Sequence, residues 1–351
     1  MKKRTRSRKG APGIIEVAKR AGVSPATVSR FYNSPDIVKG PTRNLIEKAA
    51  ADLGYIRDRM AGTMHHGFSG TFGLIVPTID NAIFAEMIEA FSARLQENDR
   101  TMLIAAHGYD LALETAIVRS LLERRIDGIG LIGFDHEAVP FNMLAQRDVP
   151  VISIWNYNKG SKIPCVGTDN SEAGRIVTKH LIDLGHRDIA FVFPEVETND
   201  RARDRLDGAL KAAKEHGIKI DENRSLSCSY DIGVAKQLAK VILNDDPPTA
   251  FVCCNDIIAH GVLFACQSMN IRVPDDISIV GIGDFGGSEH LEPGLTTVRL
   301  PAKRIGAQAA DALLSMSETG ILPRKFVQSI DLEFIERGST KRISNPTRRK
   351  I

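Results

Sequence analysis

The chain has 351 residues, of which 43% are hydrophobic, so it can build a packed core and is not a disordered polypeptide. At roughly 150 residues per domain, its length predicts about two to three folding units. No apolar run approaches the ~20 residues of a membrane span, and no apolar signal-peptide region follows the basic start. The five cysteines are odd in number and lack C-x-x-C spacing, which predicts reduced thiols in the cytosol.

Charge is unevenly distributed along the chain. Residues 1–66 hold 14 Lys and Arg against five Asp and Glu, whereas residues 67–338 hold 27 against 38. Residues 339–351 add five basic and no acidic residues. A basic head on an acidic body is typical of a protein whose one end meets a polyanion. For residues 1–9 a solubilising leader is the alternative, but from residue 14 onward the charges interleave with a periodic apolar pattern.

The basic head predicts three short helices. Apolar residues recur at i, i+3, i+4 and i+7, which places them on one face of a first helix. They are Ile14, Val17, Ala18 and Ala21. Gly22 can end that helix, and Ser24 can cap a second helix over residues 25–32 with Pro25 at its first position. With a third amphipathic stretch over residues 42–53, this pattern predicts a helix-turn-helix domain that reads DNA.

Residues 17–30 read V-A-K-R-A-G-V-S-P-A-T-V-S-R, and residues 53–55 read L-G-Y. This long pattern resembles the head of the LacI/GalR family of bacterial repressors. The resemblance implies that the second helix enters the major groove, with Pro25 and Ala26 at base edges and Arg30 at a guanine or phosphate. It also implies contacts with the DNA backbone from Thr27, Ser29 and Asn33. Simple completion of the helix surface is the alternative for the hydroxyl side chains.

The head departs from the family pattern at two helix starts. Gly13 stands where the family usually has a Thr cap, and the third helix begins K-G-P at residues 39–41 without the usual Ser. A Ser or Thr cap contributes ~1 kcal/mol, and Gly recovers part of it. We therefore expect weaker helix ends and an unchanged reading face.

Residues 57–69 are expected to form a linker with a hinge helix. Family members have a short helix here that orders on DNA and wedges an apolar residue into the minor groove, and by position that residue is Met64. Arg57 stands where a Pro commonly starts the hinge, and Gly62 lies inside it. Since Gly costs ~1 kcal/mol relative to Ala in a helix, we expect this hinge to be disordered off DNA. A plain tether is the alternative.

From residue 71 onward, short apolar strands alternate with amphipathic helices, which predicts parallel sheets covered by helices. Strands are expected at residues 72–76, 102–105, 128–132, 151–154, 189–193, 250–254 and 277–280. Helices are expected at residues 82–98, 111–124, 172–184, 201–216, 233–243 and 257–269. This stretch is long for one sheet, which predicts two lobes. Residues 255–256 (N-D) and 273–281 (V-P-D-D-I-S-I-V-G) resemble landmarks of the family's sugar-binding-protein-like core.

The expected architecture is an N-terminal all-α helix-turn-helix domain joined to an α/β, two-lobed, periplasmic-binding-protein-like core with parallel sheets. We expect a basic disordered tail at 1–13, the DNA-binding domain at 14–56, the linker at 57–69, the core at 70–338 and a basic tail at 339–351. The resemblance implies that the chain crosses between the lobes three times. The first lobe is expected at about 70–167 and 300–325, and the second at about 168–299 and 326–338.

Ligands of such folds lie in a cleft at the carboxyl ends of the strands. The family's effector positions, carried onto this sequence, are Asp80, Phe84, Trp155, Arg205, Tyr230 and Asn255. Aromatic rings can stack on a sugar face, while Asn, Asp and Arg can bind hydroxyls and a carboxylate. Ordinary core packing is the alternative for the aromatic residues.

One departure concerns the charge of the effector. The family often has Gly-aromatic-Asp-Asp after a late strand, but residues 281–284 read G-I-G-D, so that carboxylate is missing or moved to Asp284. With Phe285, this pattern resembles members that respond to gluconate-like sugar acids. A lost negative charge favours an anion, so we expect an anionic effector.

Other functions fit the sequence less well. G-x-G-x-x-G occurs at residues 128–133 and 281–286, but a dinucleotide fingerprint needs a strand before it and a helix directly after it. The first match is itself strand-like and the second runs into a broken turn, which disfavours an NAD-dependent oxidoreductase. An exported solute-binding protein would explain the body but not the basic head. No catalytic motif, cofactor or metal site is expected.

We therefore predict a cytoplasmic, sequence-specific transcriptional regulator without enzymatic activity. The predicted partners are a near-palindromic DNA operator, a second copy of the chain in a homodimer, and a small sugar or sugar-acid effector. Repression released by the effector is the expected mode, and a co-repressor is the alternative. Residues 339–351 carry no apolar heptad, so no tetramerising coiled coil is expected.

Overall fold

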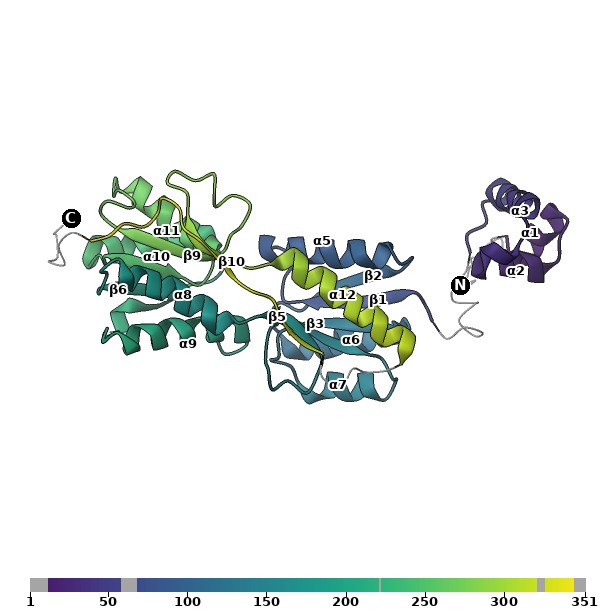
Figure 1. The fold of residues 1–351 in the computed structure, drawn as a ribbon, viewed down its shortest axis with the longest axis horizontal. Coiled ribbons are helices and arrows are strands. Elements are labelled where there is room, and N and C mark those ends of the chain that lie inside the picture. Colours follow the sequence, from purple (N-terminus) through teal and green to yellow (C-terminus); the bar gives the residue numbers. More distant parts are fainter. Residues whose placement is uncertain (1–11, 58–67, 221, 321–325, 344–351) are drawn as a thin grey trace, which may run out of the picture. The chain divides into compact units, whose positions relative to one another are not determined.

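The computed structural model describes residues 12–57, 68–220, 222–320 and 326–343, which divide into two units between residues 69 and 70. The N-terminal unit is the predicted helix-turn-helix (Figure 1). Its elements are α1 (Ile14–Ala21), α2 (Pro25–Asn33), the 3-10 turn η1 (Pro35–Ile37) and α3 (Gly40–Leu53). Its helices bury one small core made of Val17, Ala18, Ala21, Val28, Ile46, Ala49 and Ala50.

Local signals set the ends of these helices. Gly22 ends α1 in the left-handed conformation, at φ 69°. Ser24 Oγ caps α2 by accepting a hydrogen bond from Thr27 N at 3.1 Å. At the predicted weak start of α1, Gly13 N donates to Glu16 Oε2 at 2.9 Å, so an acidic side chain of the first turn supplies part of the missing cap. The α3 helix begins without a side-chain cap, as its sequence predicts.

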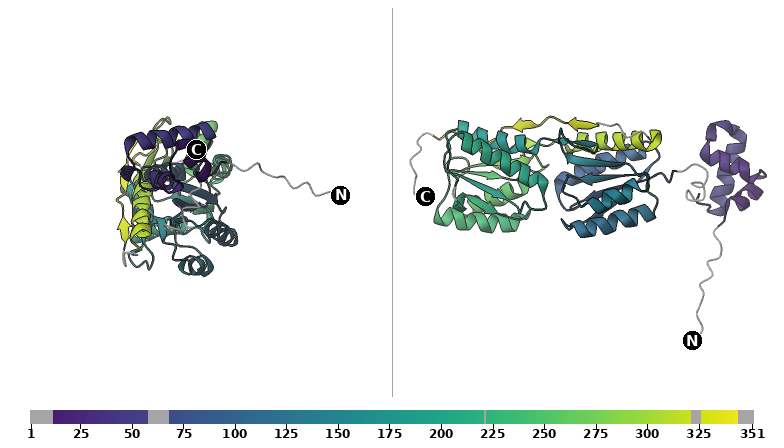
Figure 2. Two further views of the ribbon diagram at one scale, coloured as in Figure 1. Left: turned by 90° about the vertical axis from the view of Figure 1, so that its right-hand side faces the viewer. Right: turned by 90° about the horizontal axis from the view of Figure 1, so that it is seen from below.

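The C-terminal unit is the predicted two-lobed α/β core (Figures 1 and 2). The first lobe holds a parallel sheet in the order β11-β5-β4-β3-β1-β2. Its strands are β1 (Thr71–Val76), β2 (Thr101–Ala106), β3 (Gly128–Ile132), β4 (Val151–Asn156), β5 (Cys165–Thr168) and β11 (Val327–Ser329). Its helices are α5 (Ala82–Gln96), α6 (Leu111–Glu123), α7 (Ala138–Ala145) and α12 (Ala302–Thr319).

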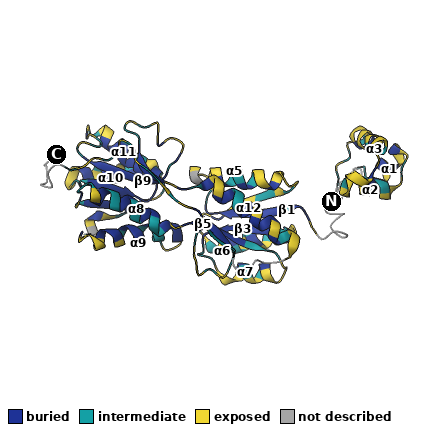
Figure 3. Ribbon diagram, in the orientation of Figure 1, coloured by how far each residue is buried: buried dark blue, intermediate teal, exposed yellow. Residues whose placement is uncertain are grey.

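Helices cover both faces of this first sheet. Leu74 and Val76 of β1 belong to the hydrophobic cluster that includes α5 and α12, whereas Ile75 belongs to the cluster under α6 and α7. Successive side chains of a strand point to opposite faces, so these two clusters lie on opposite sides of the sheet. Figure 3 shows the same layering, with buried strands and exposed outer helix faces.

The second lobe repeats this architecture in the strand order β12-β10-β9-β8-β6-β7. Its strands are β6 (Ile189–Phe193), β7 (Ser225–Ser227), β8 (Ala250–Cys253), β9 (Ser278–Gly283), β10 (Thr296–Arg299) and β12 (Glu333–Ile335). Its helical elements are α8 (Asn170–Asp183), α9 (Asp200–Glu215), η2 (Glu222–Arg224), α10 (Ile232–Asp245) and α11 (Asp256–Ser268). The edge strand β12 is antiparallel to β10, so this sheet is mixed, whereas the sequence predicted a wholly parallel sheet.

Three crossings connect the lobes, and the last one lies later than predicted. The chain passes from β5 to α8, from β10 to α12 and from β11 to β12. The expected return to the second lobe at residue 326 is wrong, because β11 pairs in parallel with β5 and so belongs to the first sheet. Cys165 N donates to Phe326 O at 2.8 Å, and Ile330 N donates to Gly167 O at 2.8 Å. The crossing therefore follows this extra edge strand.

The predicted start of a C-terminal tail at residue 339 is also wrong. Ser339 is fully buried in the second lobe. Its Oγ accepts from Thr296 N at 2.8 Å and donates to Ile279 O at 2.6 Å. A short polar residue in a basic stretch gave no sign of this role. Residues 339–343 are therefore part of the core, and residues 344–351 lie outside the described part of the chain.

The two glycine-rich motifs serve packing and turns in this fold. A Cβ on Gly128 would lie 2.9 Å from Leu313 Cγ, and one on Gly130 would lie 2.6 Å from Ile154 Cδ1. Both glycines are inside β3, as the sequence predicts. In the second motif Gly283 ends β9 at φ 144°, and no helix follows before β10. Neither motif has the strand-then-helix context of a dinucleotide site.

Candidate DNA interface and ligand cavity

The second helix of the N-terminal unit presents small and polar side chains to solvent. The six residues that the sequence predicts for DNA contact on this helix are all exposed or half-exposed. They are Pro25, Ala26, Thr27, Ser29, Arg30 and Asn33. Val28 faces inward and is fully buried, which fixes the rotation of the helix on the core. An exposed polar face on the second helix of such a domain is the surface that enters the major groove.

Arg30 differs from its neighbours on this face. Ser29 Oγ accepts from Asn33 Nδ2 at 3.2 Å, and Thr27 Oγ1 lies 2.8 Å from Ser24 Oγ. The Arg30 side chain is exposed and makes no hydrogen bond or ion pair with any residue that the structure describes. Its guanidinium fork is therefore free for two parallel bonds to an acceptor pair such as guanine O6 and N7.

The predicted hinge contact cannot be placed. Met64 lies within residues 58–67, outside the described residues, together with Gly62 and the rest of the expected hinge helix. The described residues before this gap end at Arg57, and those after it begin at residue 68.

Five of the seven predicted effector residues line one small cavity in the core. They are Phe84, Trp155, Arg205, Tyr230 and Asn255. The lining is completed by Asn81, Tyr109, Arg201 and Phe285. The cavity is narrow and lies where several strands of both sheets reach their carboxyl ends. Its lining holds two arginines and no carboxylate, so it favours an anion.

Trp155 forms an aromatic wall of the cavity. Its ring meets the Phe84 ring edge-on, with centroids 5.2 Å apart. Trp155 has φ 89°, a left-handed value that a bulky side chain rarely adopts. On the next strand, a Cβ at Gly167 would lie 2.3 Å from the Trp155 carbonyl carbon, so glycine is needed there. Strained backbone next to a cavity is often associated with function.

Arg205 projects from α9 with its charge unneutralised by any described carboxylate. It is 5% exposed, and its Nε donates to Asn170 Oδ1 at 2.8 Å. Its Nη1 donates to Cys254 O at 3.1 Å. No described residue accepts a hydrogen bond from its Nη2. A buried guanidinium with free donors is a strong site for a ligand carboxylate.

Arg201 lies one turn earlier on the same helix. Its Nη1 donates to Asp200 Oδ1 at 2.7 Å, and the side chain is buried. Burial disfavours the charged form of Arg201, but attraction to Asp200 outweighs it, and the pKa of Arg201 is raised. Arg201 is therefore a cation paired with Asp200, whereas Arg205 has no described carboxylate partner.

The remaining polar groups of the lining are neutral. Asn255 Oδ1 caps α11 by accepting from Ile258 N at 3.1 Å, which leaves its Nδ2 without a partner among the described residues. Burial raises the pKa of the Tyr230 phenol well above its ordinary value, so this phenol keeps its proton. It accepts a hydrogen bond from Asn199 Nδ2 at 3.1 Å. Such groups can bind the hydroxyls of a small polyol.

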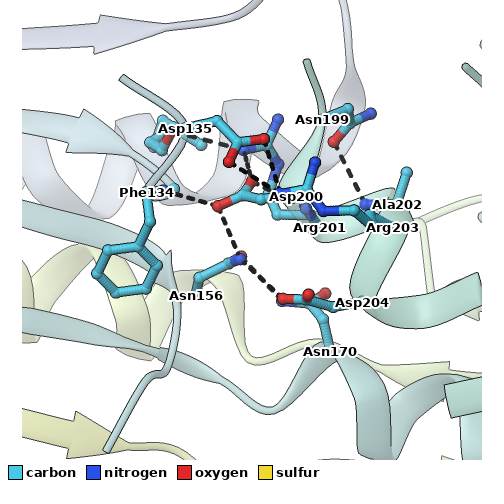
Figure 4. Close-up of polar contacts among 12 residues, drawn as sticks. Phe134, Asp135, Asn156, Asn170, Asn199, Asp200, Arg201, Ala202, Arg203 and Asp204 are labelled. Carbon is cyan, nitrogen blue, oxygen red and sulfur yellow. Dashed lines mark hydrogen bonds and ion pairs between the residues drawn. The ribbon is translucent and has the colours of Figure 1, made fainter. Parts of the chain in front are cut away.

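The amino-terminal turn of α9 also bonds to the opposite lobe (Figure 4). Asp200 Oδ2 accepts from Phe134 N at 2.6 Å and from Asn156 Nδ2 at 3.0 Å. Arg203 Nη2 donates to the two carboxylate oxygens of Asp135 at 2.8 and 2.9 Å. These contacts hold the two lobes together beside the cavity.

Two asparagines link this interlobe contact to the cavity (Figure 4). Asn156 Oδ1 accepts from Asn170 Nδ2 at 3.0 Å, and Asn170 Oδ1 accepts from Arg205 Nε at 2.8 Å. Asn156 Nδ2 also lies 3.3 Å from Asp204 Oδ2. Burial, with added repulsion from Asp200, raises the pKa of Asp204 to about 6. Direct hydrogen bonds therefore connect Arg205 to the first lobe through Asn170 and Asn156.

Two predicted effector residues lie outside this cavity. Asp80 is exposed beside it, and its backbone N donates to Thr78 Oγ1 at 3.1 Å. Asp284 accepts from Arg299 Nε at 2.7 Å and forms an ion pair with Arg337 Nη2 at 2.7 Å. Two arginines therefore bind the Asp284 carboxylate, and its role toward the effector stays a prediction.

Comparisons with known proteins agree with this geometry. A family model described as "Bacterial regulatory proteins, lacI family" matches residues 13–58, and a "Periplasmic binding protein-like domain" matches residues 178–340. The HTH-type transcriptional regulator GntR of Escherichia coli (strain K12) is 31% identical over 314 residues, which cover 88% of this chain and 92% of the relative. The HTH-type transcriptional repressor PurR of Escherichia fergusonii is 30% identical over 331 residues, covering 93% and 96%.

This chain belongs to the LacI family. Among solved structures, the transcription regulator GntR from Chromobacterium violaceum matches 77% of this chain and 99% of its own, with 28% identity and a TM-score of 0.72. The lac repressor dimer bound to operator and the anti-inducer ONPF matches 95% of this chain and 100% of its own, with 24% identity and a TM-score of 0.83, which shows a shared fold. The LacI-family chain is accordingly a DNA-binding transcriptional regulator.

Sequence reasoning missed four lining residues of this LacI-family core. Arg201 precedes Arg205 by one helical turn, and this i, i+4 spacing was a signal for a shared face. Asn81 and Tyr109 follow β1 and β2, where ligand-binding residues of such folds gather. Phe285 follows β9 in the same way. No described helix of this chain is long and apolar enough to cross a membrane.

Proposed function

We propose that this LacI-family chain is a cytoplasmic, homodimeric repressor whose operator affinity is controlled by a small anionic sugar derivative, and that it has no enzymatic activity. One observation carries the proposal. The exposed helix α2 carries an arginine side chain without a described partner, and the core of the same chain has a narrow cavity lined by two arginines and no carboxylate. The first feature suits a polyanionic surface, and the second suits a single small anion.

On the DNA side, Arg30 bonds a guanine, and Pro25 and Ala26 contact base edges. The flanking residues Thr27, Ser29 and Asn33 hold the backbone, and Met64 is the proposed minor-groove wedge. One small domain gives limited interface, so two copies bind half-sites about one helical turn, ~34 Å, apart. Affinity falls steeply with salt, because phosphate contacts dominate it.

On the effector side, Arg205 and Arg201 bind the acid group. The Trp155 and Phe84 rings stack on the carbon skeleton, while Asn255 and Tyr230 bind hydroxyls. The space between the lining residues is narrow, which favours a small compound. Solved structures of this fold are described with cellobiose and with bound ribose, so the fold accepts such compounds.

Binding in the cavity favours one relative arrangement of the lobes. Phe84 and Trp155 come from the first lobe, whereas Arg205, Tyr230 and Asn255 come from the second. A ligand that contacts both sets stabilises the closed core. Coupling of about 1–3 kcal/mol between effector and DNA changes operator affinity about 5- to 150-fold.

Calorimetric titration tests this proposal. Purified protein is titrated with gluconate, glucose and ribose, and operator affinity is measured with and without each compound. We expect gluconate to bind and to change operator affinity, whereas the neutral sugars do not bind. Binding of neutral sugars alone would contradict the proposal of an anionic effector. An absence of any DNA sequence preference would contradict the proposed regulatory function.

A further inference from the structure

Arg57, the residue at the start of the linker, is bonded to the end of the recognition helix. Its Nη1 donates to Tyr32 O at 2.7 Å, and its Nη2 donates to Asn33 Oδ1. Its Cζ lies 5.7 Å from the centroid of the Tyr32 ring. Arg57 is only half-buried, so this contact is at the surface. Nothing in the comparisons assigns a role to this residue.

Helix electrostatics explain why arginine is suited to this place. The α2 helix ends at Asn33, and the last carbonyls of a helix lack partners within it. The same end carries a partial negative charge, which favours a cation. The Tyr32 ring adds a cation–π contact. Arg57 therefore fastens the linker to the recognition helix across 24 residues of chain.

The contact also orients a residue of the proposed DNA-backbone site. Asn33 Oδ1 accepts from Arg57, and Asn33 Nδ2 donates to Ser29 Oγ at 3.2 Å. This chain of bonds fixes which way the Asn33 amide points. The guanidinium has five N–H donors, and its bonds to the described residues use Nη1 and Nη2 once each, so further donors stay free.

We propose that Arg57, Asn33 and Ser29 form a binding site for one backbone phosphate of DNA, with Arg57 supplying its charge. The proposal rests on the proposed function as a DNA-binding regulator. A phosphate approaching this end of α2 meets the guanidinium together with the side chains of Asn33 and Ser29. Such a contact adds affinity without sequence preference, and it fixes the point from which the linker leaves the recognition helix.

Salt dependence of DNA binding tests this site. An operator is first selected by the wild-type dimer from a random library, and a scrambled duplex serves as non-specific DNA. Affinities of the wild type and of Arg57→Ala are then measured over a range of salt concentrations. We expect Arg57→Ala to lower the affinity for both duplexes by the same factor. The slope of log K against log salt should fall by about 0.9 per protomer, the contribution of one phosphate.

A matched control separates this effect from a change in net charge. Arg20→Ala removes the same charge from an exposed ion pair with Asp52, 3.0 Å apart, between α1 and α3. Its slope should equal that of the wild type. Arg57→Lys keeps the charge without the fork, so it should keep most of the slope and lose part of the affinity.

A second variant keeps the test decisive if Arg57→Ala unfolds the domain. Asn33→Asp places a carboxylate beside Arg57, which should neutralise the site and again lower the slope. The phosphate site would be overturned if folded Arg57→Ala or Asn33→Asp kept the wild-type slope of log K against log salt. It would also be overturned if Arg20→Ala lowered this slope as much as Arg57→Ala does. A wild-type protein that selects no operator at all would instead overturn the proposed function.

Discussion

The two candidate binding regions hold their arginines in opposite environments. In the N-terminal unit, the Arg30 side chain is exposed and has no described partner. In the core, Arg205 is 5% exposed and is held by Asn170 and by the Cys254 carbonyl. A DNA duplex is a large surface that can approach an open helix face, whereas a small ligand must be enclosed to bury enough of its surface.

This difference separates binding from stability. An exposed side chain without partners can be removed with little effect on folding, typically within about 0.5 kcal/mol. A buried arginine is part of the packed structure, so its removal leaves acceptors such as Asn170 Oδ1 without a partner. We therefore expect substitution of Arg30 to change binding alone, and substitution of Arg205 to change binding and stability together.

The largest effect is expected for Arg205→Ala. Truncating a buried, hydrogen-bonded charge that pairs with a ligand costs about 2–5 kcal/mol of binding free energy. Effector affinity should therefore fall by more than an order of magnitude in calorimetry, and thermal unfolding of the core should begin at a lower temperature. Operator binding without effector should stay intact.

Arg205→Lys is the matched control for this variant. It keeps a positive charge but loses the planar fork that bonds Asn170 Oδ1 and the Cys254 carbonyl together. We expect an intermediate effector affinity. If Arg205→Ala binds gluconate as tightly as the wild type, Arg205 does not hold the acid group.

Arg30→Ala should have the next largest effect. Loss of a bidentate contact with guanine costs about 1–3 kcal/mol, so operator affinity should fall roughly 5- to 150-fold. The variant should also discriminate less between bases at one position of the operator. The melting temperature of the head should not move. Fluorescence anisotropy with the selected operator and with single-base variants measures both properties. A uniform loss on all sequences would show that Arg30 contacts phosphate instead.

The contrast between the regions also explains what the sequence could predict. The head was predictable, because caps, turns and reading face lie within residues 13–55 and depend on neighbours in the chain. In the core, most long strands and helices were predictable from periodicity, but α12, the longest described helix, was not among the expected helices. Short strands such as β5 and β11 were missed, since three or four residues carry too little pattern to be told from a loop.

The cavity was predictable only in part. Residues at the ends of recognisable strands, such as Trp155 and Asn255, could be placed by resemblance. The ion pairs of Asp284 could not be predicted, because its partners are distant in the sequence. Arg299 lies on β10 and Arg337 lies after β12, and they meet Asp284 only in the folded chain. The buried role of Ser339 was hidden for the same reason. Long-range pairing of charges leaves no local signal in a single sequence.

The interlobe ion pair allows a smaller test of the coupling between cavity and lobes. Arg203 and Asp135 side chains are 36% and 29% exposed, so solvent screens the pair. Such pairs contribute about 0.2–1 kcal/mol. Asp135→Asn should therefore weaken effector binding by up to about fivefold at low salt and by less at high salt. Asp311→Asn, which breaks an ion pair with Arg94 within the first lobe, is the control.

The smallest effect concerns pH and again distinguishes the two regions. Burial lowers the pKa of His186 in the second lobe to about 4, and its ring contacts Thr249 Oγ1 and Lys341 O. In the unfolded chain a histidine has a pKa of about 6.5, so the unfolded state binds the proton more tightly than the folded state. The stabilising contribution of neutral His186 is therefore complete above pH 6.5 and is lost as the pH falls toward 4. Between pH 7.5 and 6 this linkage amounts to about 0.8 kcal/mol.

Comparing the wild type with His186→Gln isolates this contribution, because the difference cancels other titrating groups. One of them is Asp204, whose raised pKa acts in the opposite direction, since its proton is bound more tightly in the folded core. The described head contains no histidine, so its unfolding should not change over the same pH range. If His186→Gln retains the full acid sensitivity of the core, the buried imidazole is not its source.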